Sequence, residues 1–523
     1  MEGPRSSRAK FGRAPAQTSL KPVPERQIER MADKPNIVLF VPDSYRGDVL
    51  GHQGDTGAVT PNLDALVARD AVSYGNAFAQ NPVCTPSRCS FMTGWYPHVH
   101  GHRSMRNMLK EQEPNLLTVL RREGYHVWWG GKNDLVRVRE RADFLRYCDE
   151  KFWPGGKYSD HMEYRQPPSL APDDPRHGAF YRGVLTRDGE GKPHYDQDTA
   201  WVLGALDMIR SRSGDQPFLC YLPLSKPHPA YCAEKDHYDA IDPDRLPPRI
   251  PTPDRDANLP AVMDAFREEY RSDEITEEMW RDIKRIYYAM CSKVDELFGM
   301  VVDALVEQGL YDNTWILFFS DHGDFTGDYS LPEKAHSTLQ DCLVHVPLIV
   351  KPPADVPSKR GNRKLLAELV DVTATLYDLL GVEPGYAHQG VSLRSSLAGE
   401  ETAIHDAVFA EVGGRANEIG FINTEVLEMP PDSFYARQGR AGIPHHEAGS
   451  HAVMCRTPEH KYVRRYYTGH HELFDLVADP GETRNVCRHP DYADVERWME
   501  TRLLDFFMHT ADVLPHEPDS RRV

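Results

Sequence analysis

Short runs of consecutive apolar residues recur along the chain and predict buried strands. Such runs occupy positions 37–41, 125–129, 218–222, 315–319 and 346–350. A strand covered by helices on both faces of a parallel sheet reads as a nearly continuous apolar run, whereas a half-exposed strand alternates apolar and polar residues. The five runs therefore predict a sheet that is buried on both faces.

Segments with the spacing of amphipathic helices lie between these runs. The clearest is 277–308, where apolar residues recur every three or four positions. Two more helices are predicted to open at Pro61 and Pro114, because proline is favoured in the first helical turn. Another is predicted at 365–380. This alternation of strands and helices predicts an α/β fold with a mostly parallel sheet sandwiched by helices.

Changes of pattern divide the chain into predicted parts. Residues 1–33 lack an apolar run and are expected to form a disordered leader. Residues 34–387 carry the strand and helix alternation, interrupted at 151–193 by a stretch rich in Pro, Gly, Tyr and Asp that predicts a long irregular insertion. Residues 388–523, with short strands and a last helix near 495–507, are expected to form a smaller C-terminal α+β domain.

The acidic composition limits the class of partner. The 523 residues include 61 Lys and Arg against 79 Asp and Glu, a formal net charge of -18. Nucleic-acid binding that is independent of sequence needs a basic surface, so no nucleic-acid partner is expected. An anionic small molecule remains compatible with this charge, because a few cations and a metal ion can dominate a local pocket.

Cysteine usage and hydropathy bear on location. The nine cysteines contain no C-x-x-C pair, and such an unpatterned set is typical of a reducing compartment. The first thirty residues hold no secretory apolar segment, and no stretch is long and apolar enough to span a bilayer. We therefore expect a cytoplasmic protein without a membrane partner.

Four of the predicted strands are each followed directly by side chains suited to metal or anion chemistry. In chain order these are Asp43 and Ser44, Lys132 and Asp134, Lys226 and His228, and Asp321 and His322. In an open α/β sheet, ligands bind beyond the carboxyl ends of the strands. The four groups therefore predict one site at that edge of the sheet.

A pentapeptide indicates which chemistry this site performs. The segment Cys84-Thr85-Pro86-Ser87-Arg88 resembles the C-x-P-x-R site of type I sulfatases in the alkaline-phosphatase-like superfamily. Asp43, Gly131-Lys132, Pro227-His228, Ser320 to Gly323 and Lys334 follow the family's order, and Glu472 to Leu476 is similar to its C-terminal Glu-Leu-Tyr-Asp-Leu stretch. The resemblance therefore covers most of the chain.

The resemblance implies hydrolysis of a sulfate monoester to an alcohol or phenol and inorganic sulfate. In that family a dedicated maturation enzyme oxidises the cysteine, here Cys84, to formylglycine (3-oxoalanine). One hydroxyl of the hydrated aldehyde attacks sulfur, and the second allows sulfate to leave. The expected partners are that maturation enzyme and a small-molecule or carbohydrate sulfate ester, and a homo-oligomer is compatible with the sequence.

The resemblance also implies roles for single residues. One divalent metal ion would be held by Asp43, Ser44, position 84, Asp321 and His322; oxygen-rich ligation favours Ca²⁺, with Mn²⁺ or Mg²⁺ as alternatives. Arg88 would anchor the nucleophile, Lys132 and Lys334 would bind sulfate oxygens, and His228 would protonate the leaving oxygen. Substrate-binding roles fall to Asp134, Lys226 and His336.

Three positions depart from the family pattern. Ser44 stands where many members have a second Asp, and Asp134 stands where some have a histidine that helps to expel sulfate. Asp134, or a histidine among His98, His100 and His102, would then have to replace that base. Cys89 has no role in the family scheme and is interpreted as a buried structural residue.

Three other functions stay open from the sequence. The nearest is a phosphonate monoester or phosphodiester hydrolase with the same aldehyde nucleophile. A phosphatase or phosphomutase of the same fold would use Thr85 as nucleophile and would need two metal ions. A chain whose Cys84 is never oxidised would only bind sulfated ligands.

Overall fold

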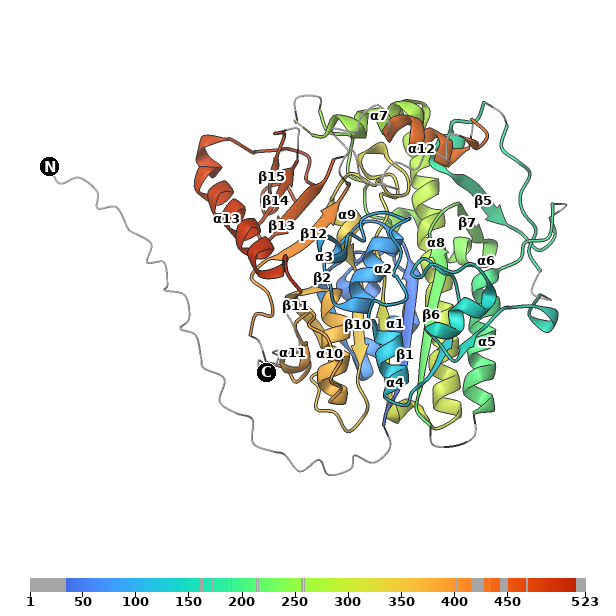
Figure 1. The fold of residues 1–523 in the computed structure, drawn as a ribbon. Helices are drawn as coiled ribbons and strands as arrows, with labels where there is room; N and C mark the ends of the chain where they lie inside the picture. The colour runs from blue at the N-terminus through green and yellow to red at the C-terminus, as the bar shows by residue number, and fades with distance from the viewer. Residues whose placement is uncertain are drawn as a thin grey trace, which may run out of the picture. The chain divides into compact units, whose positions relative to one another are not determined.

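The predicted apolar strands assemble into one large sheet in the computed structural model of the protein (Figure 1). Its eight strands in spatial order are β11 (Gly361–Glu368), β2 (Val72–Phe78), β10 (Leu348–Lys351), β8 (Thr314–Phe319), β1 (Asn36–Asp43), β6 (Phe218–Pro227), β3 (His126–Trp129) and β4 (Glu150–Lys151); a ninth, β9 (His345–Val346), pairs with β2. The structure describes residues 34–159, 163–171, 173–189, 191–212, 214, 216–254, 257, 259–400, 402–414, 428–431, 433–442, 450–466 and 469–513. The predicted leader, 1–33, lies outside these residues.

The sheet is mostly parallel, as the sequence predicts. Strand β1 lies at its centre and pairs in parallel with β6 and β8. Strand β10 runs antiparallel to both β8 and β2. Because β1, β6, β3 and β8 run in the same direction, their carboxyl ends meet at one edge, and the chain that follows each of them gathers there.

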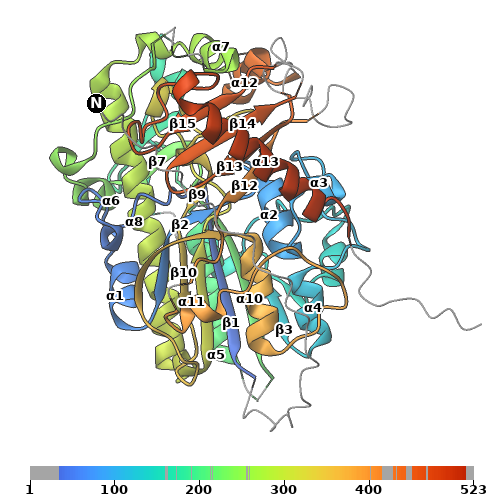
Figure 2. The same ribbon diagram turned by 90° about the vertical axis from the view of Figure 1, so that its left-hand side faces the viewer.

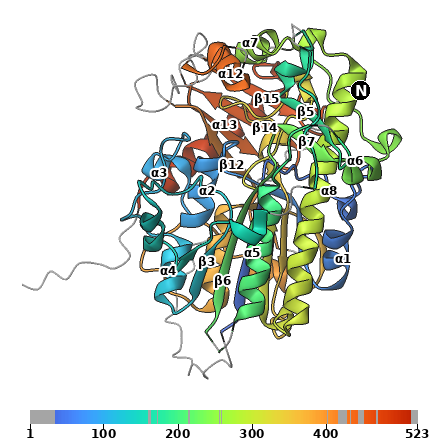
Figure 3. The ribbon, with the colours of Figure 1, turned by 90° about the vertical axis from the view of Figure 1, so that its right-hand side faces the viewer.

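Helices cover both faces of the sheet, which explains the continuous apolar runs (Figures 1 and 3). Val38 and Phe40 of β1 pack into one core, together with α1 (Pro61–Arg69), α5 (Gln197–Ser211) and α8 (Glu277–Glu307). Ile37, Leu39 and Val41 pack into the other, together with α2 (Cys84–Thr93), α4 (Leu116–Arg122) and α10 (Val370–Leu380). Successive side chains of one strand therefore serve two separate cores.

A second sheet lies in the C-terminal part of the chain (Figure 2). Its strands, all antiparallel, are β12 (Val408–Val412), β13 (Ala452–Arg456), β14 (His460–Arg465) and β15 (Glu472–Asp475), and α13 (Ala493–Thr510) packs against it. Glu411 of β12 accepts a hydrogen bond from the backbone N–H of His98 in α3 (Pro97–His100). The region from Pro35 onward forms one compact unit, and the division at residue 388 stays a prediction.

Smaller elements surround the carboxyl edge. Within 151–193 the chain is largely irregular, but β5 (Tyr181–Leu185) pairs in parallel with β7 (Tyr231–Glu234). The remaining short helices are α6 (Lys235–Ala240), α7 (Ala261–Glu269), α9 (Asp341–Val344), α11 (Arg394–Leu397) and α12 (Phe434–Gly442). None of the helices in the described part of the chain has the length and apolar character needed to cross a membrane.

One predicted element is wrong in part. The segment 365–380 was predicted as a single helix, but its first residues complete strand β11. Leu366 and Ala367 pair with Asn76 and Ala77 of β2, and the helix α10 begins only at Val370. The apolar residues before Val370 face a core as part of a strand, and the pattern alone does not separate the two states.

Candidate active site

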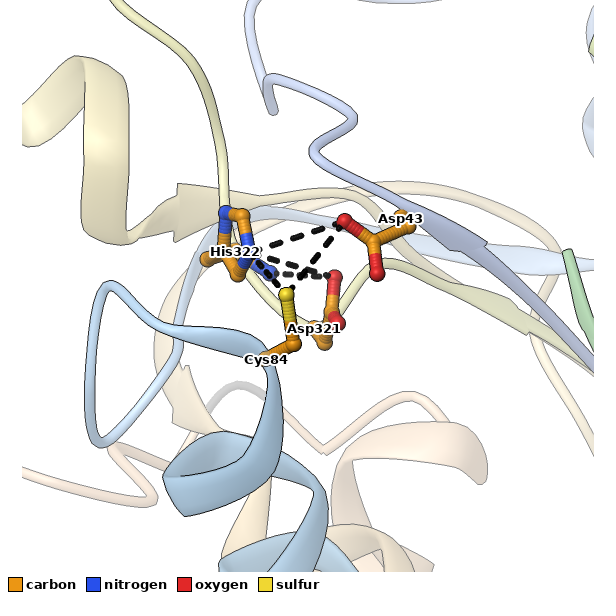
Figure 4. Close-up of side chains that lie close together, drawn as sticks. All are labelled: Asp43, Cys84, Asp321 and His322. Atoms are coloured by element: carbon orange, nitrogen blue, oxygen red, sulfur yellow. Dashed lines mark hydrogen bonds and ion pairs between the residues drawn. The ribbon is translucent and has the colours of Figure 1, made fainter. Parts of the chain in front are cut away.

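Cys84 lies where three segments meet at the carboxyl edge of the sheet. It is the first residue of α2, Asp43 is the last residue of β1, and Asp321 and His322 follow β8 directly. Figure 4 shows the four side chains pointing toward one another. Sγ of Cys84 lies 3.2 Å from Nε2 of His322 and 3.7 Å from Oδ1 of Asp43. All four residues are buried.

The start of α2 holds Cys84 in place. Oδ1 of Asn81 accepts a hydrogen bond from the backbone N–H of Val83, while Nδ2 of Asn81 donates to the backbone oxygen of Glu411 in the C-terminal sheet. Three residues after Cys84, Oγ of Ser87 donates to the carbonyl of Asp321 at 2.6 Å. Position 84 lies at the N-terminus of a helix, where the helix dipole favours an anion.

Arg88 joins the two carboxylates from below Cys84. Its Nε donates to Oδ2 of Asp321 and its Nη2 donates to Oδ2 of Asp43, both at 2.8 Å. The guanidinium and both carboxylates have no exposed surface. Removing one partner of a buried ion cluster leaves an uncompensated charge that costs about 3–5 kcal/mol. Arg88 therefore fixes the spacing of Asp43 and Asp321.

Ser44 occupies a left-handed backbone conformation, with φ of 67°. This conformation aims its backbone N–H at Oδ1 of Asp321, at 3.2 Å. Its hydroxyl donates to Oδ1 of Asp43 at 3.0 Å, and its carbonyl accepts a hydrogen bond from Tyr287. Ser44 thus lies beside the cluster, where its backbone N–H and hydroxyl contact the two carboxylates.

His322 has the tautomer that a metal ligand needs. Its Nδ1 lies 2.7 Å from the carbonyl of Gly323, which can only accept, so Nδ1 carries the proton and Nε2 has a free lone pair. Nε2 lies 3.6 Å from Oδ1 of Asp43 and 4.0 Å from Oδ1 of Asp321. Burial lowers the pKa of His322, which keeps the ring neutral.

These residues fit a divalent metal ion. One ligand atom from each of Asp43, Cys84, Asp321 and His322 can be chosen so that all four lie within 4.8 Å of one another. The Oδ2 atoms are held by Arg88, which leaves the Oδ1 atoms facing His322. Two carboxylates and one imidazole with a carbonyl behind it form a donor set suited to Ca²⁺, Mg²⁺ or Mn²⁺.

Lys132 approaches the cluster from the loop after β3. Its Nζ lies 2.6 Å from Oδ2 of Asp43 and 2.7 Å from Oδ2 of Asp134. Burial alone would raise the pKa of Asp43, but Lys132, His228 and Arg88 outweigh it and hold that pKa well below its usual range. The preceding Gly131 has φ of +82°, and a Cβ there would lie 1.9 Å from the carbonyl oxygen of Pro223. Glycine is therefore required at 131.

His228 and Lys334 form a second pair beside the cluster. Nδ1 of His228 donates to the carbonyl of Pro229 at 2.5 Å, so Nε2 accepts the 2.8 Å hydrogen bond from Nζ of Lys334. Burial and Lys334 lower the pKa of His228 to about 4, which leaves the ring neutral at pH 7. His336, two residues beyond Lys334, has an exposed side chain.

Not every candidate lies with this cluster. Lys226 contacts Asp196 at 2.7 Å through Nζ, and its backbone N–H donates to Asp198. Its ammonium is therefore engaged by carboxylates at the start of α5. His98 contacts Glu411, and His100 and His102 both contact Glu113. Among the candidate bases, Asp134 is connected to the cluster, because Lys132 contacts both Asp134 and Asp43.

Two residues near the site were not singled out from the sequence. Ser87 lies inside the pentapeptide, and its spacing one turn from Cys84 was a usable signal. Glu333 is buried directly before Lys334, and its Oε1 lies 2.6 Å from Nζ of that lysine. A carboxylate next to a lysine in sequence is too common to mark a site without the structure.

The charges around position 84 are nearly balanced. The carboxylates of Asp43, Asp134, Asp321 and Glu333 face the cations of Arg88, Lys132 and Lys334. With both histidines neutral, these groups carry one net negative charge. A divalent cation and a singly charged anion would together bring the site to neutrality.

Comparison with known proteins agrees with this geometry. The family model described as Sulfatase matches residues 35–382. The choline-sulfatase of Rhizobium meliloti (strain 1021) is 27% identical over 512 residues, covering 94% of this chain and 90% of that protein. Arylsulfatase K of Rattus norvegicus is 26% identical over 504 residues, with 89% and 77% covered.

A solved structure of another hydrolase shares the fold. The crystal structure of the phosphonate monoester hydrolase of Agrobacterium radiobacter superposes with a TM-score of 0.72 at 22% identity, covering 92% of this chain and all of that one. At this identity the likeness shows the fold. The family model and the curated relatives establish the rest: the chain belongs to the sulfatase family and is a sulfuric ester hydrolase.

Proposed function

We propose that the protein hydrolyses a sulfate monoester with a formylglycine that a maturation enzyme forms from Cys84. The observation that carries this proposal is the place of Cys84, at a helix N-terminus and 3.2 Å from Nε2 of His322. An aldehyde hydrate there supplies one hydroxyl to attack sulfur and a second to release sulfate. A serine at 84 would lack the second hydroxyl.

The residues around position 84 divide the remaining work. Lys132 and Lys334 bind the sulfate oxygens as two point charges. His228 protonates the leaving oxygen through Nε2, once the Lys334 ammonium has turned from that nitrogen to the sulfate and the ring has taken up a proton. Arg88 keeps Asp43 and Asp321 at a fixed separation, so the nucleophile meets a preorganised set of charges.

Asp43, Asp321, His322 and position 84 would hold one divalent metal ion. When bound, the ion polarises a sulfate oxygen and favours ionisation of the attacking hydroxyl. Oxygen-rich ligation supports Ca²⁺ over Mn²⁺ or Mg²⁺. One divalent cation of any of these elements, together with one sulfate monoester, would balance the single net negative charge of the groups around position 84.

The substrate proposed is a small-molecule or carbohydrate sulfate ester. The names choline-sulfatase and arylsulfatase K among the relatives support this class. His336 is exposed and close in sequence to Lys334, and the proposal assigns it contact with the alcohol part of the ester. The cytoplasmic location and a homo-oligomeric state stay predictions.

A phosphonate monoester or phosphodiester hydrolase is the second candidate. The neutral Ser44, in place of a second metal-binding carboxylate, favours it, because in the family resemblance such hydrolases also keep one Asp followed by a non-acidic residue. The position of Lys132 argues against a phosphodiester substrate. Its ammonium is fixed between Asp43 and Asp134, so the second substituent of a phosphodiester would have to fit beside a half-buried cation.

A comparison of matched esters tests the proposal. Nitrophenyl sulfate, nitrophenyl phenylphosphonate and a nitrophenyl phosphodiester are to be measured on protein with residue 84 fully oxidised. The proposal expects the highest kcat/KM for the sulfate monoester. A clear advantage of the phosphodiester or phosphonate would replace it with the second candidate. Cys84→Ser serves as the control that removes the aldehyde.

A further inference from the structure

Glu333 is a buried carboxylate at the leaving-group end of the site. Only 1% of its surface is exposed. Its Oε1 lies 2.6 Å from Nζ of Lys334 and 3.4 Å from Nε2 of His228. Glu333 has no role in the proposed sulfatase mechanism, although it contacts both Lys334 and His228, which that mechanism places at the leaving oxygen.

Contacts with β7 and α12 hold Glu333 in place. The backbone N–H of Glu333 donates to the hydroxyl of Tyr231 in β7 at 2.8 Å. Nε2 of Gln438 in α12 donates to Oε2 of Glu333 at 3.3 Å and to the carbonyl of Lys334 at 3.0 Å. Glu333 itself has a left-handed backbone, with φ of 57°. A residue held in this conformation by several partners has little freedom to turn away.

The carboxylate sets the direction of a flexible lysine. The four-carbon stem of a lysine allows its ammonium many positions. Here Oε1 of Glu333 and Nε2 of His228 both accept from Nζ of Lys334, and the Pro229 carbonyl fixes which ring nitrogen can do so. We propose that Glu333 is a positioning residue that binds the Lys334 ammonium beside His228 and offsets its charge there, so that Nε2 of His228 can still carry the proton for the leaving oxygen. The inference rests on the proposed role of His228 as the acid.

Glu333 also balances the charges that face His228. Those groups are Lys334, Lys132, Asp43 and Glu333. The two lysines disfavour the imidazolium and the two carboxylates favour it. Glu333→Gln removes one favourable charge and leaves both lysines, so less of the acid is available for the leaving oxygen. The loss should therefore grow as the leaving group becomes more basic.

Aryl sulfates with leaving groups from nitrophenol to phenol give the first readout. Glu333→Gln should lower kcat about 10- to 100-fold for phenyl sulfate and less than about 3-fold for nitrophenyl sulfate, within the range expected of general acid catalysis. Glu333→Asp should recover part of the loss. Gln438→Ala, a milder change at the same carboxylate, should give the same pattern with a smaller amplitude. An equal loss across the series would overturn the proposal.

A matched control separates this effect from a general loss of packing. Glu368 is another carboxylate with 1% exposed surface, hydrogen-bonded to the hydroxyl of Tyr96 and to the backbone N–H of Phe409. Glu368→Gln should leave the leaving-group dependence unchanged. If it changes that dependence as Glu333→Gln does, the selectivity does not come from the Lys334 and His228 pair, and the proposal fails.

The second readout needs no turnover. NMR titration of the His228 imidazole should give a lower pKa in Glu333→Gln than in the wild type, with Glu333→Asp between them. Identical titrations would overturn the proposed contact. If the wild type hydrolyses no sulfate ester, the proposed function fails, while the titration still decides whether Glu333 acts on His228.

Discussion

Sγ of Cys84 lies 3.2 Å from Nε2 of His322, although 237 residues separate them in the chain. The contact exists because α2 starts and β8 ends at the same edge of the sheet. Burial and the nearby Asp43 raise the pKa of the Cys84 thiol well above its usual range. An unmodified Cys84 is therefore a protonated thiol, and its place among carboxylates and a neutral histidine suits an oxygen nucleophile better.

Asp321→Asn should abolish most metal binding and lower kcat more than about 100-fold, because the change removes one carboxylate charge from the cation site. Ser44→Ala removes only a neutral hydroxyl that donates to Asp43, so we expect a loss of less than about 10-fold. Metal content by mass spectrometry of the dialysed proteins and steady-state rates check both values.

Thermal unfolding of both variants is the necessary control, since Asp321 also binds the buried Arg88. Restoration of the Asp321→Asn rate by excess metal would agree with a ligand role. Equal metal content and equal rates in the two variants would show that Asp321 is no more important to the ion than Ser44.

His228→Asn should affect esters with basic leaving groups most. A general acid contributes roughly 100- to 10,000-fold when the leaving oxygen needs a proton, and little when it does not. We expect a steep dependence of kcat on the leaving-group pKa in the variant and a shallow one in the wild type. If kcat depends on the leaving-group pKa with the same slope in both proteins, His228 only orients the ester.

His405 provides a pH-dependent test of how the C-terminal sheet is joined to the rest. Its Nε2 lies 2.8 Å from Oδ2 of Asp371 in α10. Burial alone would lower the pKa of His405, but Asp371 and Glu368 outweigh it and raise the pKa to about 9. Because the folded pKa exceeds the ordinary value of 6.5, the stabilisation is complete below pH 6.5 and is lost as pH rises through 9.

His405→Gln should therefore be less stable than the wild type by about 1–3 kcal/mol at pH 6, and the difference should shrink toward zero near pH 10. Urea denaturation at a series of pH values gives this difference directly. His489→Gln, at a site whose side chain is 48% exposed, should follow the wild type throughout. A difference that grows with pH would contradict the assignment.

The sheet could be predicted from the sequence because both of its faces are buried. Continuous apolar runs such as 37–41 and 315–319 survive as β1 and β8 almost unchanged. The direction of β10 could not be predicted, since the short apolar run 346–350 reads the same in both orientations. Strand β2 was missed because Ser73, Gly75 and Asn76 interrupt its apolar pattern.

For the site, the order of residues along the chain predicts which of them share an edge of the sheet, but it does not predict where each side chain points. Residues that follow parallel strands must share an edge, so Asp43, Lys132 and Asp321 could be grouped from spacing alone. Lys226 follows the same rule, yet its side chain turns to Asp196 at the start of α5. Glu333 could not be predicted, because its proposed role depends on contacts with β7 and α12 that no local sequence pattern encodes.

Mass spectrometry of the peptide that contains residue 84, measured together with the turnover of nitrophenyl sulfate, tests the central claim most directly. Preparations made with increasing amounts of the maturation enzyme should contain increasing fractions of formylglycine at 84, and kcat per protein should rise in proportion and extrapolate to zero for the intact thiol. An active preparation in which residue 84 is entirely unmodified cysteine would contradict the account.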